Sequence, residues 1–564
     1  MALIQSLREH GYEPYFYDID SKRPSFEQVL KFFREYKPDF VGISAVVSTA
    51  YEYTKKLSLA LKEMYPDMPL AVGGNLAASA ELLHRFCKVD ICGIGEGDKV
   101  IINLARYVES HKGPLDREAL GKIKGLTFLN EKGDMVFTGY EDLLPAEELK
   151  DPDYSIVEQY STLSQFLTDP LEHPGFSRDP RTYESHRRGK KSGIVVSAKG
   201  CVARCTFCHR WDKGYRPLPV DKVIHKMKYL IDRYNVGFFC IGDENFGSDK
   251  NQVAEFIKEV KKLDVLYSLH GVRCRTVDLE LLKTLRASGC SSIFYGMETG
   301  STRILQVMEK NATCETNLNA ARWTEEAGLY TVYQMILGMP GETSETVQET
   351  LDFIKKITEV RKERPSKLLS INYIQALPGT PVFEHARQKG LIGKTLEDEE
   401  KYLIEISDVN ANDDTKFINF TEEDYFTVQS WRHKILFEAE RHWLRVHNWK
   451  APDYRLPDGS IPQGQDYYTQ GGYFNLKKVV HSNFVFRYLY PLRPLYLAAY
   501  VVTKSFFRQP QRVFWRNVID YFRVRIRKHV ALEEYKSLRR IVKENTPPSL
   551  TLTEQSMQPL RDGR

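Results

Sequence analysis

The chain has 564 residues, and its 42% hydrophobic and 12% aromatic content is typical of a globular protein of roughly two to four domains. Its 80 basic and 75 acidic residues leave a net charge of +5, which argues against a dedicated nucleic-acid binder. Nine unevenly spaced cysteines, an odd number, favour a reducing cytoplasm over a disulfide framework. We see no signal-peptide pattern at the N-terminus and no uncharged apolar run of roughly 18 residues that would predict a spanning helix.

Residues 1–115 alternate between helical and strand patterns. Apolar residues recur at helical spacing over 26–33 and 51–65, and apolar runs typical of strands occupy 14–19, 39–44, 70–74 and 89–94. Alternation of this kind predicts a parallel, doubly wound sheet whose ligand crevice lies at the carboxyl ends of the strands. Gly73, Gly74, Gly95 and Gly97 fall at such ends, where a missing side chain lets a ligand approach the backbone.

Residues 116–192 lose this rhythm. Two short apolar runs, 125–129 and 135–138, flank a polar turn and predict a β-hairpin. A linker rich in proline and charge follows. We expect this segment to connect the first domain to the second.

Three cysteines, Cys201, Cys205 and Cys208, form a CxxxCxxC array directly after the apolar run 193–197. The spacing is not that of a zinc finger, because no second Cys/His pair follows at the usual interval. Three thiolates leaving a strand can hold an iron–sulfur cluster whose fourth iron stays open to another ligand. The alternative is three unconnected core cysteines.

Residues 193–395 resume the strand–helix alternation and predict a partial TIM-like barrel of six βα units, in which the chemistry lies at the carboxyl ends of the strands. These predicted ends are polar or rich in glycine, as a site there would require. They are found at 242–245, 273, 296–300, 338–343 and 377–381.

Residues 396–564 predict a mainly α-helical region. A long helix rich in aromatic residues and histidine covers 425–449; we favour an ordinary packing helix with exposed histidines over a cover for the barrel mouth. Residues 451–475 predict a loop, and the tail after Thr546 predicts disorder. Aromatic residues and arginines interleave over 484–530, where we favour a buried helix and keep contact with a lipid surface as the alternative.

The cysteine array, with Phe207 before its third cysteine, resembles the radical S-adenosylmethionine (SAM) enzymes. The resemblance implies that Cys201, Cys205 and Cys208 bind a [4Fe–4S] cluster and that SAM chelates its open iron. It further implies that Asp243 and Glu244 receive the SAM amino group. Glu298 would contact the ribose or carboxylate, and Gly338 and Pro340 would lie near the adenine.

The first domain resembles the Rossmann-like cobalamin-binding domain that precedes many radical SAM enzymes, through 41–44, 72–74 and 93–97. By that resemblance Ser44, Gly73, Gly74, Gly95 and Gly97 would contact cobalamin. The DxHxxG signature is absent, so no axial histidine is expected from it, and the chain opens without the first strand of the fold. The alternative is a domain that only packs against its neighbour.

Together the resemblances imply a cobalamin-dependent C-methyltransferase. It would use a 5′-deoxyadenosyl radical and methylcobalamin on an unactivated carbon of a small-molecule or lipid- or saccharide-type substrate. One alternative is a radical SAM oxidoreductase, cyclase or rearrangement enzyme without methyl transfer; a second is an iron–sulfur electron carrier or redox sensor. We expect a flavodoxin or ferredoxin as electron donor, no nucleic-acid partner, a cytoplasmic location, and a possible peripheral membrane contact through the C-terminal region.

Overall fold

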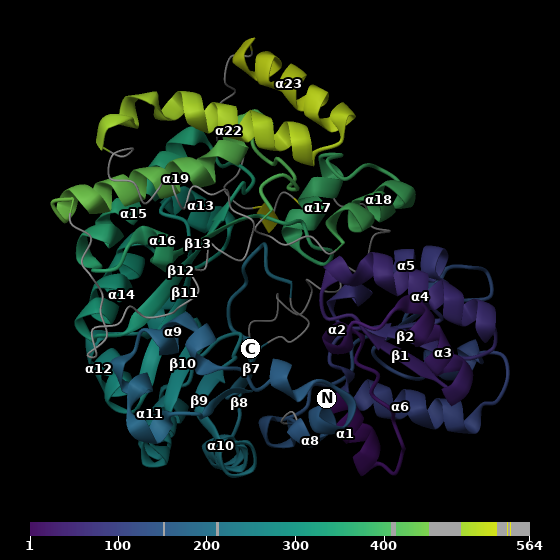
Figure 1. Cartoon of the computed structure of the whole chain (residues 1–564). Helices are drawn as coiled ribbons and strands as arrows, with labels where there is room; N and C mark the ends of the chain where they lie inside the picture. The colour runs from purple at the N-terminus through teal and green to yellow at the C-terminus, as the bar shows by residue number, and fades with distance from the viewer. Residues whose placement is uncertain are drawn as a thin grey trace.

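The computed structural model describes residues 1–150, 153–209, 214–407, 413–449 and 487–526, together with residues 538, 539 and 542. An N-terminal domain lies beside a larger domain built on a curled sheet, and two C-terminal helices lie along the outer side of the larger domain (Figure 1). The loop predicted at 451–475 and the disorder predicted after Thr546 fall outside the described residues.

The N-terminal sheet has the strand order β1-β2-β3-β4-β5. Its first three strands are parallel, as the alternating pattern predicts. They are β1 (Val41–Ser44), β2 (Leu70–Gly73) and β3 (Ile91–Gly93). The accompanying helices are α1 (Ala2–Glu9), α2 (Ile19–Lys22), α3 (Phe26–Tyr36), α4 (Tyr51–Met64), α5 (Ala80–Cys87), α6 (Gly97–Ser110) and α7 (Arg117–Gly121).

The strand predicted at 14–19 is wrong. The segment has no strand hydrogen bonds, although its alternating aromatic side chains do pack, with the rings of Tyr15 and Tyr17 at 5.0 and 4.3 Å from that of Phe32. The segment does not pair with β1, which is therefore an edge strand of the described sheet. The alternation along this segment predicts which side chains pack against the domain, but it does not predict whether the backbone pairs with another strand.

The hairpin predicted after the first domain is present, and it belongs to the first domain's sheet. Its strands are β4 (Leu126–Leu129) and β5 (Met135–Phe137). β4 pairs antiparallel with β3, bringing Thr127 opposite Cys92. Hydrogen bonding to β3 therefore extends the N-terminal sheet into residues 116–192, which the sequence assigned to a hairpin and linker outside the first domain.

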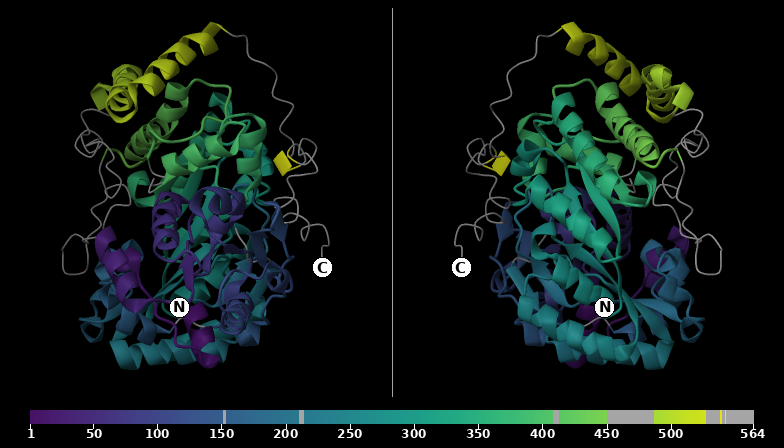
Figure 2. Two further views of the ribbon diagram at one scale, coloured as in Figure 1. Left: turned by 90° about the vertical axis from the view of Figure 1, so that its right-hand side faces the viewer. Right: turned by 90° about the vertical axis from the view of Figure 1, so that its left-hand side faces the viewer.

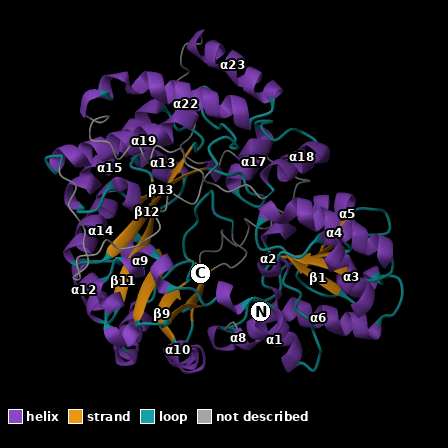
Figure 3. Ribbon diagram, viewed as in Figure 1, coloured by secondary structure: helices purple, strands orange, loops and turns teal. Residues whose placement is uncertain are grey.

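The larger domain is a half-open barrel of six parallel strands in the order β13-β12-β11-β10-β9-β6, which confirms the predicted partial barrel (Figure 3). All six carboxyl ends share one rim because every strand runs the same way. The strands are β6 (Lys191–Val195), β9 (Val236–Ile241), β10 (Leu266–Val272), β11 (Cys290–Glu298), β12 (Tyr330–Leu337) and β13 (Leu369–Tyr373). Their helices are α10 (Val220–Tyr234), α11 (Lys250–Val260), α12 (Leu279–Ala287), α13 (Thr302–Val307), α14 (Cys314–Glu326), α15 (Ser344–Val360) and α16 (Pro365–Leu368).

The described C-terminal residues are helical, as predicted. α19 (Tyr425–Val446) packs against α15 and is a packing helix, but His433 is buried and pairs with Asp414 at 2.7 Å, so the expectation of exposed histidines fails there. The outermost helices are α22 (Arg493–Arg508) and α23 (Gln511–Ile526) (Figure 2). Among the described helices, none is both long and apolar enough to cross a membrane.

A shared hydrophobic cluster joins the N-terminal domain to the barrel rim. Leu76 and Ala77, which follow β2, pack in the same cluster as Met339 and Ile374, which follow β12 and β13. Helix α18 (Leu396–Ile406) also contacts α4, and Tyr51 donates a hydrogen bond to Glu400 at 2.8 Å. The carboxyl edge of the first sheet therefore faces the carboxyl rim of the second.

Candidate active site

The cysteine array lies at the tip of a hairpin that follows the first barrel strand. Its strands, β7 (Ala198–Cys201) and β8 (Gly214–Pro217), pair antiparallel, so Cys201 is fixed opposite Gly214. Cys205 is buried and Cys208 is exposed, and neither they nor Cys201 form a disulfide with a described residue. The Sγ atom of Cys201 accepts the N–H of Ala203 at 3.4 Å.

Thr206, between the second and third cysteines, anchors the loop to the barrel rim. Its N–H donates to the Met308 carbonyl and its hydroxyl to the Val307 carbonyl, both at 3.0 Å. Arg539 reaches the loop from the C-terminal region and donates to the Arg204 carbonyl at 2.9 Å. These contacts hold the cysteines against the ends of the barrel strands before any cofactor binds.

Glu298 ends β11 in a left-handed conformation (φ 66°), an uncommon state for a side chain other than glycine. Its carboxylate pairs at 2.5 Å with Lys310. Burial opposes the charge on Lys310, but Glu298 and the Cys205 thiol outweigh it and raise the Lys310 pKa. Lys310 therefore places a cation close to Cys205. The residue predicted to contact SAM thus lies close to the cysteine loop.

Asp243 holds the start of the cysteine hairpin. Oδ1 accepts the N–H groups of Ser197 and Ala198 at 2.7 and 3.2 Å, and Oδ2 accepts the Ser197 hydroxyl at 2.5 Å. Burial raises the Asp243 pKa, although these hydrogen bonds act to lower it. Its neighbour Glu244 is exposed. The assignment of both residues to the SAM amino group stays a prediction, and the described contacts of Asp243 are structural.

Gly338 and Pro340 lie in the turn after β12, where Gly338 has a φ of 85°. No described hydrogen bond joins this turn to the cysteine loop, but Met339 and Phe207 share one hydrophobic cluster. The N–H groups of Gly338 and Met339 donate to Oε2 of the buried Glu342 at 2.5 and 3.3 Å, and Oε1 has no partner among the described residues.

We expect Glu342 to make stability fall with rising pH. Burial raises the Glu342 pKa to about 8, against the two N–H contacts. The folded protein therefore holds this proton more tightly than the unfolded chain does. This stabilisation is full below the ordinary glutamate pKa and is lost as the pH rises through about 8. Glutamine has no proton to lose in this range. Between about pH 6 and about pH 9 the free energy of unfolding of Glu342→Gln should therefore fall by about 3 kcal/mol less than that of the wild type.

Thermal unfolding across this pH range checks the prediction, with exposed Glu345→Gln as the matched control. The wild type and the control should lose melting temperature together while Glu342→Gln stays flatter. Parallel curves for all three proteins would show that Glu342 titrates normally.

The predicted cobalamin contacts lie together at the carboxyl edge of the first sheet. Ser44 ends β1 opposite Gly73, while Gly95 and Gly97 follow β3. Gly74 has a φ of 87°, and a Cβ there would lie 2.4 Å from the Ala45 carbonyl oxygen, so this turn requires glycine. The structure brings the five residues to one edge, and their contact with cobalamin stays a prediction.

The two edges meet beside the third cysteine. A Cβ on Gly379, in the loop after β13, would lie 3.0 Å from the ring of His209 and 3.2 Å from the Ala78 side chain. Ala78 belongs to the segment after Gly74, and His209 follows Cys208 directly. Burial lowers the His209 pKa to about 4, against a hydrogen bond with Pro378, so the ring is neutral at physiological pH. The glycine leaves room for both domains to approach the cluster loop.

Glu96 connects the two domains, and sequence reasoning missed it. Lying between Gly95 and Gly97, it is buried and pairs with Lys199 of β7 and with Arg216 of β8, whose guanidinium lies 3.0 and 3.1 Å from its two oxygens. Burial opposes the ionised form, but Arg216, Lys199 and the Leu144 N–H outweigh it and lower the Glu96 pKa. No local pattern marks such a pair, because its members are 103 and 120 residues apart.

The barrel interior carries a polar group made by His173, Cys240 and His270. Cys240 is only half-buried, and its donor atom lies within 4.8 Å of those of His173 and His270. Cys240 pairs in register with Ile194, 52% exposed, and they share the face opposite the helix-covered Phe239. These residues therefore line the lumen below the rim.

Both imidazoles of this group are neutral. Burial, with His270 nearby, lowers the His173 pKa to about 3, and burial lowers that of His270 to about 4. The Gly175 N–H donates to Nδ1 of His173 at 3.2 Å, so the ring proton resides on Nε2. This makes Nε2 a hydrogen-bond donor rather than a metal ligand. His270 also stacks on Phe294 at 4.5 Å, which gives the lumen an aromatic wall.

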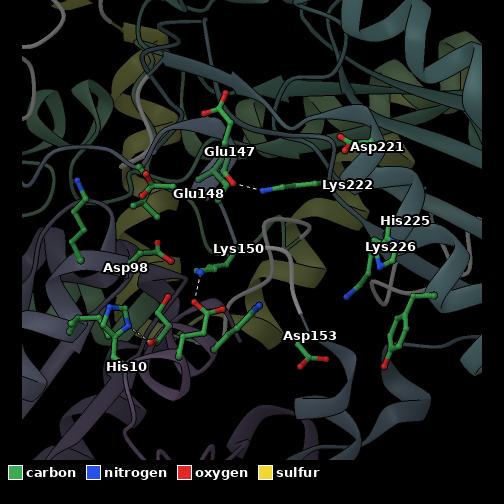
Figure 4. Close-up of a pocket in the computed structure, with 18 of the residues that line it drawn as sticks. His10, Asp98, Glu147, Glu148, Lys150, Asp153, Asp221, Lys222, His225 and Lys226 are labelled. Atoms are coloured by element: carbon green, nitrogen blue, oxygen red, sulfur yellow. Dashed lines mark hydrogen bonds and ion pairs between the residues drawn. The ribbon is translucent and has the colours of Figure 1, made fainter.

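A groove of about 1610 Å³ lies elsewhere, between α1, α6, the segment after the hairpin and α10 (Figure 4). Its charged side chains have both signs, and several pair across it, including Lys150 with Glu9 and Lys222 with the Glu147 carbonyl. None of the predicted cofactor residues lines it. We interpret this groove as a seam between domains.

The donor sets fit the predicted cofactors. Three cysteines on one anchored loop, with an amide N–H on one sulfur and a cation beside another, suit a cluster that requires thiolates. At the first domain's edge, a Cβ on Gly73 would meet no atom within 4 Å, so the backbone there is open to a ligand, whereas Gly74, Gly95 and Gly97 lie against Ala45, Tyr140 and Leu3.

Comparison with known proteins agrees with this assignment. Residues 195–354 match the Radical SAM superfamily, and residues 1–105 match the B12 binding domain. These matches confirm the two predicted domains and the cofactors that such domains use, which are a [4Fe–4S] cluster, SAM and cobalamin.

Individual relatives are more distant. The chain is 28% identical to the anaerobic magnesium-protoporphyrin IX monomethyl ester cyclase of Cereibacter sphaeroides over 62% of this chain, spanning 54% of that protein. It is 24% identical to an uncharacterized methyltransferase of Pyrococcus horikoshii over 70% of this chain and 79% of that protein. The solved radical SAM methyltransferase TsrM of Kitasatospora setae, with cobalamin and [4Fe–4S] cluster bound, shares the fold at a TM-score of 0.52 and 19% identity, covering 70% of this chain and 75% of TsrM.

Proposed function

Because this chain carries a radical SAM domain behind a B12-binding domain, we propose that it is a cobalamin-dependent radical SAM enzyme that methylates an unactivated carbon of a small-molecule substrate. A lipid- or saccharide-type substrate fits the same proposal. One observation carries it: the glycine edge of the first sheet meets the cysteine loop at Ala78, His209 and Gly379. A reaction that uses both cofactors on one carbon requires this juxtaposition.

The chain's own residues supply position and shielding. Cys201, Cys205 and Cys208 would hold the cluster at the rim, with Asp243 and Thr206 fixing their loop. When bound, the cluster and SAM supply a hydrogen-abstracting 5′-deoxyadenosyl radical and cobalamin supplies the methyl group. His173, Cys240 and His270 form a polar, uncharged wall below the rim where a substrate would lie. The shared hydrophobic cluster excludes water from the junction.

The decisive measurement is anaerobic. Reconstituted protein with cobalamin, dithionite and SAM labelled at its methyl group is expected to release 5′-deoxyadenosine and to transfer label to the protein-bound cobalamin fraction. Absence of 5′-deoxyadenosine would contradict the radical SAM assignment and favour an electron carrier or redox sensor. If 5′-deoxyadenosine is released but no label leaves SAM, the result would contradict methyl transfer and leave the radical SAM assignment in place.

A second candidate is radical cyclisation or another oxidative rearrangement without methyl transfer. The name of the cyclase relative favours it. In the same assay this candidate predicts 5′-deoxyadenosine without label on cobalamin. A neutral lumen wall suits either reaction, so only the fate of the methyl group separates them.

An electron donor completes the proposal. Cluster reduction requires one electron from outside the chain, and we propose a flavodoxin or ferredoxin in a reducing cytoplasm as its source. Reduced flavodoxin should replace dithionite in the 5′-deoxyadenosine assay.

A further inference from the structure

Exposed apolar side chains concentrate on the two outermost helices. Of the twenty large apolar side chains that are exposed among the described residues, ten lie between residues 488 and 522. Leu495 is 70% exposed, Phe507 76%, Trp515 56% and Phe522 61%. A concentration of exposed apolar side chains of this kind is typical of an interaction site.

Helix α22 has apolar residues on two faces. Leu497 and Val501 face inwards with the buried Ser505, which bonds to Gln429 of α19 at 2.7 Å. On the exposed side a second stripe recurs at helical spacing, made by Leu495, Ala499, Val502 and Phe506. Packing on α19 explains the first face and leaves the second unexplained.

Helix α23 repeats this arrangement with arginines beside the apolar stripe. Phe514 is buried in a cluster with Phe426 of α19, while Trp515, Ile519 and Phe522 form an exposed stripe at helical spacing. Four exposed arginines lie beside the apolar stripes of the two helices and make no ion pair with any described residue. They are Arg508, Arg512, Arg516 and Arg523.

The charge of this surface is predominantly positive. Between residues 487 and 526 the chain has eight arginines and lysines and one carboxylate, Asp520. A second copy of the chain would place this cationic surface against itself, which like-charge repulsion disfavours. A nucleic acid would leave the apolar stripes unburied, since its surface is polar and charged. An anionic lipid surface satisfies both features, because acyl chains accept the apolar side chains and headgroups pair with the arginines.

We propose that α22 and α23 form a peripheral docking surface for a membrane rich in anionic lipid, with the two helices lying in the interfacial plane. The views of Figure 2 agree that both helices are outermost on the molecule, with no described element over them. Arg525 of α23 pairs at 3.1 Å with Asp424 before α19, and Tyr425 stacks on Phe417, which stacks on Tyr373 at the end of β13. Docking would therefore place a lipid surface on the side of the barrel where β13 meets the rim.

Sedimentation with vesicles tests the proposal on the full chain. The wild type is expected to sediment with vesicles of phosphatidylcholine and phosphatidylglycerol, less at high salt, and weakly with phosphatidylcholine alone. Trp515→Glu with Phe522→Glu should abolish binding. Arg512→Ser with Arg516→Ser should lower the partition coefficient for anionic vesicles by roughly 10- to 30-fold.

The matched control is Leu391→Glu, an exposed apolar position distant in sequence from both helices, which should bind like the wild type. Unchanged thermal melting of the Trp515/Phe522 variant separates lost docking from lost folding. The proposal would be overturned if the wild type failed to bind anionic vesicles, or if the Trp515/Phe522 variant still bound them. Sedimentation equilibrium showing that these substitutions convert a dimer to a monomer without affecting vesicle binding would also overturn it. None of these readouts depends on the methyltransferase assignment.

Discussion

Replacing Cys208 with serine is expected to remove the iron–sulfur cluster, and with it the formation of 5′-deoxyadenosine, from an otherwise folded protein. Cys208 is exposed, so its replacement by serine leaves no cavity in the core. The melting temperature of the cluster-free protein should therefore not change. The loss of activity should exceed the roughly 100-fold that removal of an outer-shell partner costs. Iron content after anaerobic reconstitution and 5′-deoxyadenosine release measure the two effects.

Cys314→Ser is the matched control. Cys314 is half-buried, lies outside the array and donates to the Gly300 carbonyl at 3.1 Å, a contact that serine can keep. This variant should bind iron and release 5′-deoxyadenosine like the wild type. Full iron content in the Cys208 variant would show that the array does not hold the cluster.

Glu96→Gln should uncouple the two domains. Loss of its charge leaves Arg216 and Lys199 without their buried partner, and breaking a pair of this kind costs about 3–5 kcal/mol. The three cysteines that would hold the cluster lie on the hairpin itself, so radical formation should persist. Methyl transfer requires the first domain to sit against that hairpin, so it should fall relative to 5′-deoxyadenosine release by about 10-fold or more.

A double-mutant cycle with Arg216→Met measures the coupling directly, because the double variant removes both charges together. Exposed Glu131→Gln, on the turn of the β4–β5 hairpin of the same domain, is the control and should change neither readout. An equal fall in radical formation and methyl transfer would show that Glu96 supports the cluster hairpin rather than the position of the first domain.

Much of the fold and part of the site could be predicted from local features. Cys201, Cys205 and Cys208 lie within eight residues, so their spacing alone brings the thiols together. The strand ends carrying Glu298 and Gly338 follow from periodicity, since parallel strands place all carboxyl ends on one rim. The same logic placed Gly73, Gly74, Gly95 and Gly97 at the edge of the first sheet.

Other features depended on partners distant in sequence. The segment 14–19 alternates like a strand but pairs with no described strand, and Asp243 binds the backbone of Ser197 and Ala198. A third example is Cys240, which only the fold brings beside His173 and His270. Composition and periodicity describe one segment at a time and do not specify which segments pack together.

The sequence by itself determined the kind of chemistry, because the three cysteines predicted to bind the cluster are close together in the chain. The tertiary structure alone decided how the two domains meet and which helical faces stay exposed. Glu96 reaches Lys199 and Arg216 only when the barrel has folded against the first sheet. Likewise, α22 is apolar on two sides, and only its packing on α19 shows which of them faces outwards. Contacts between distant segments are selected by packing, which no local pattern records.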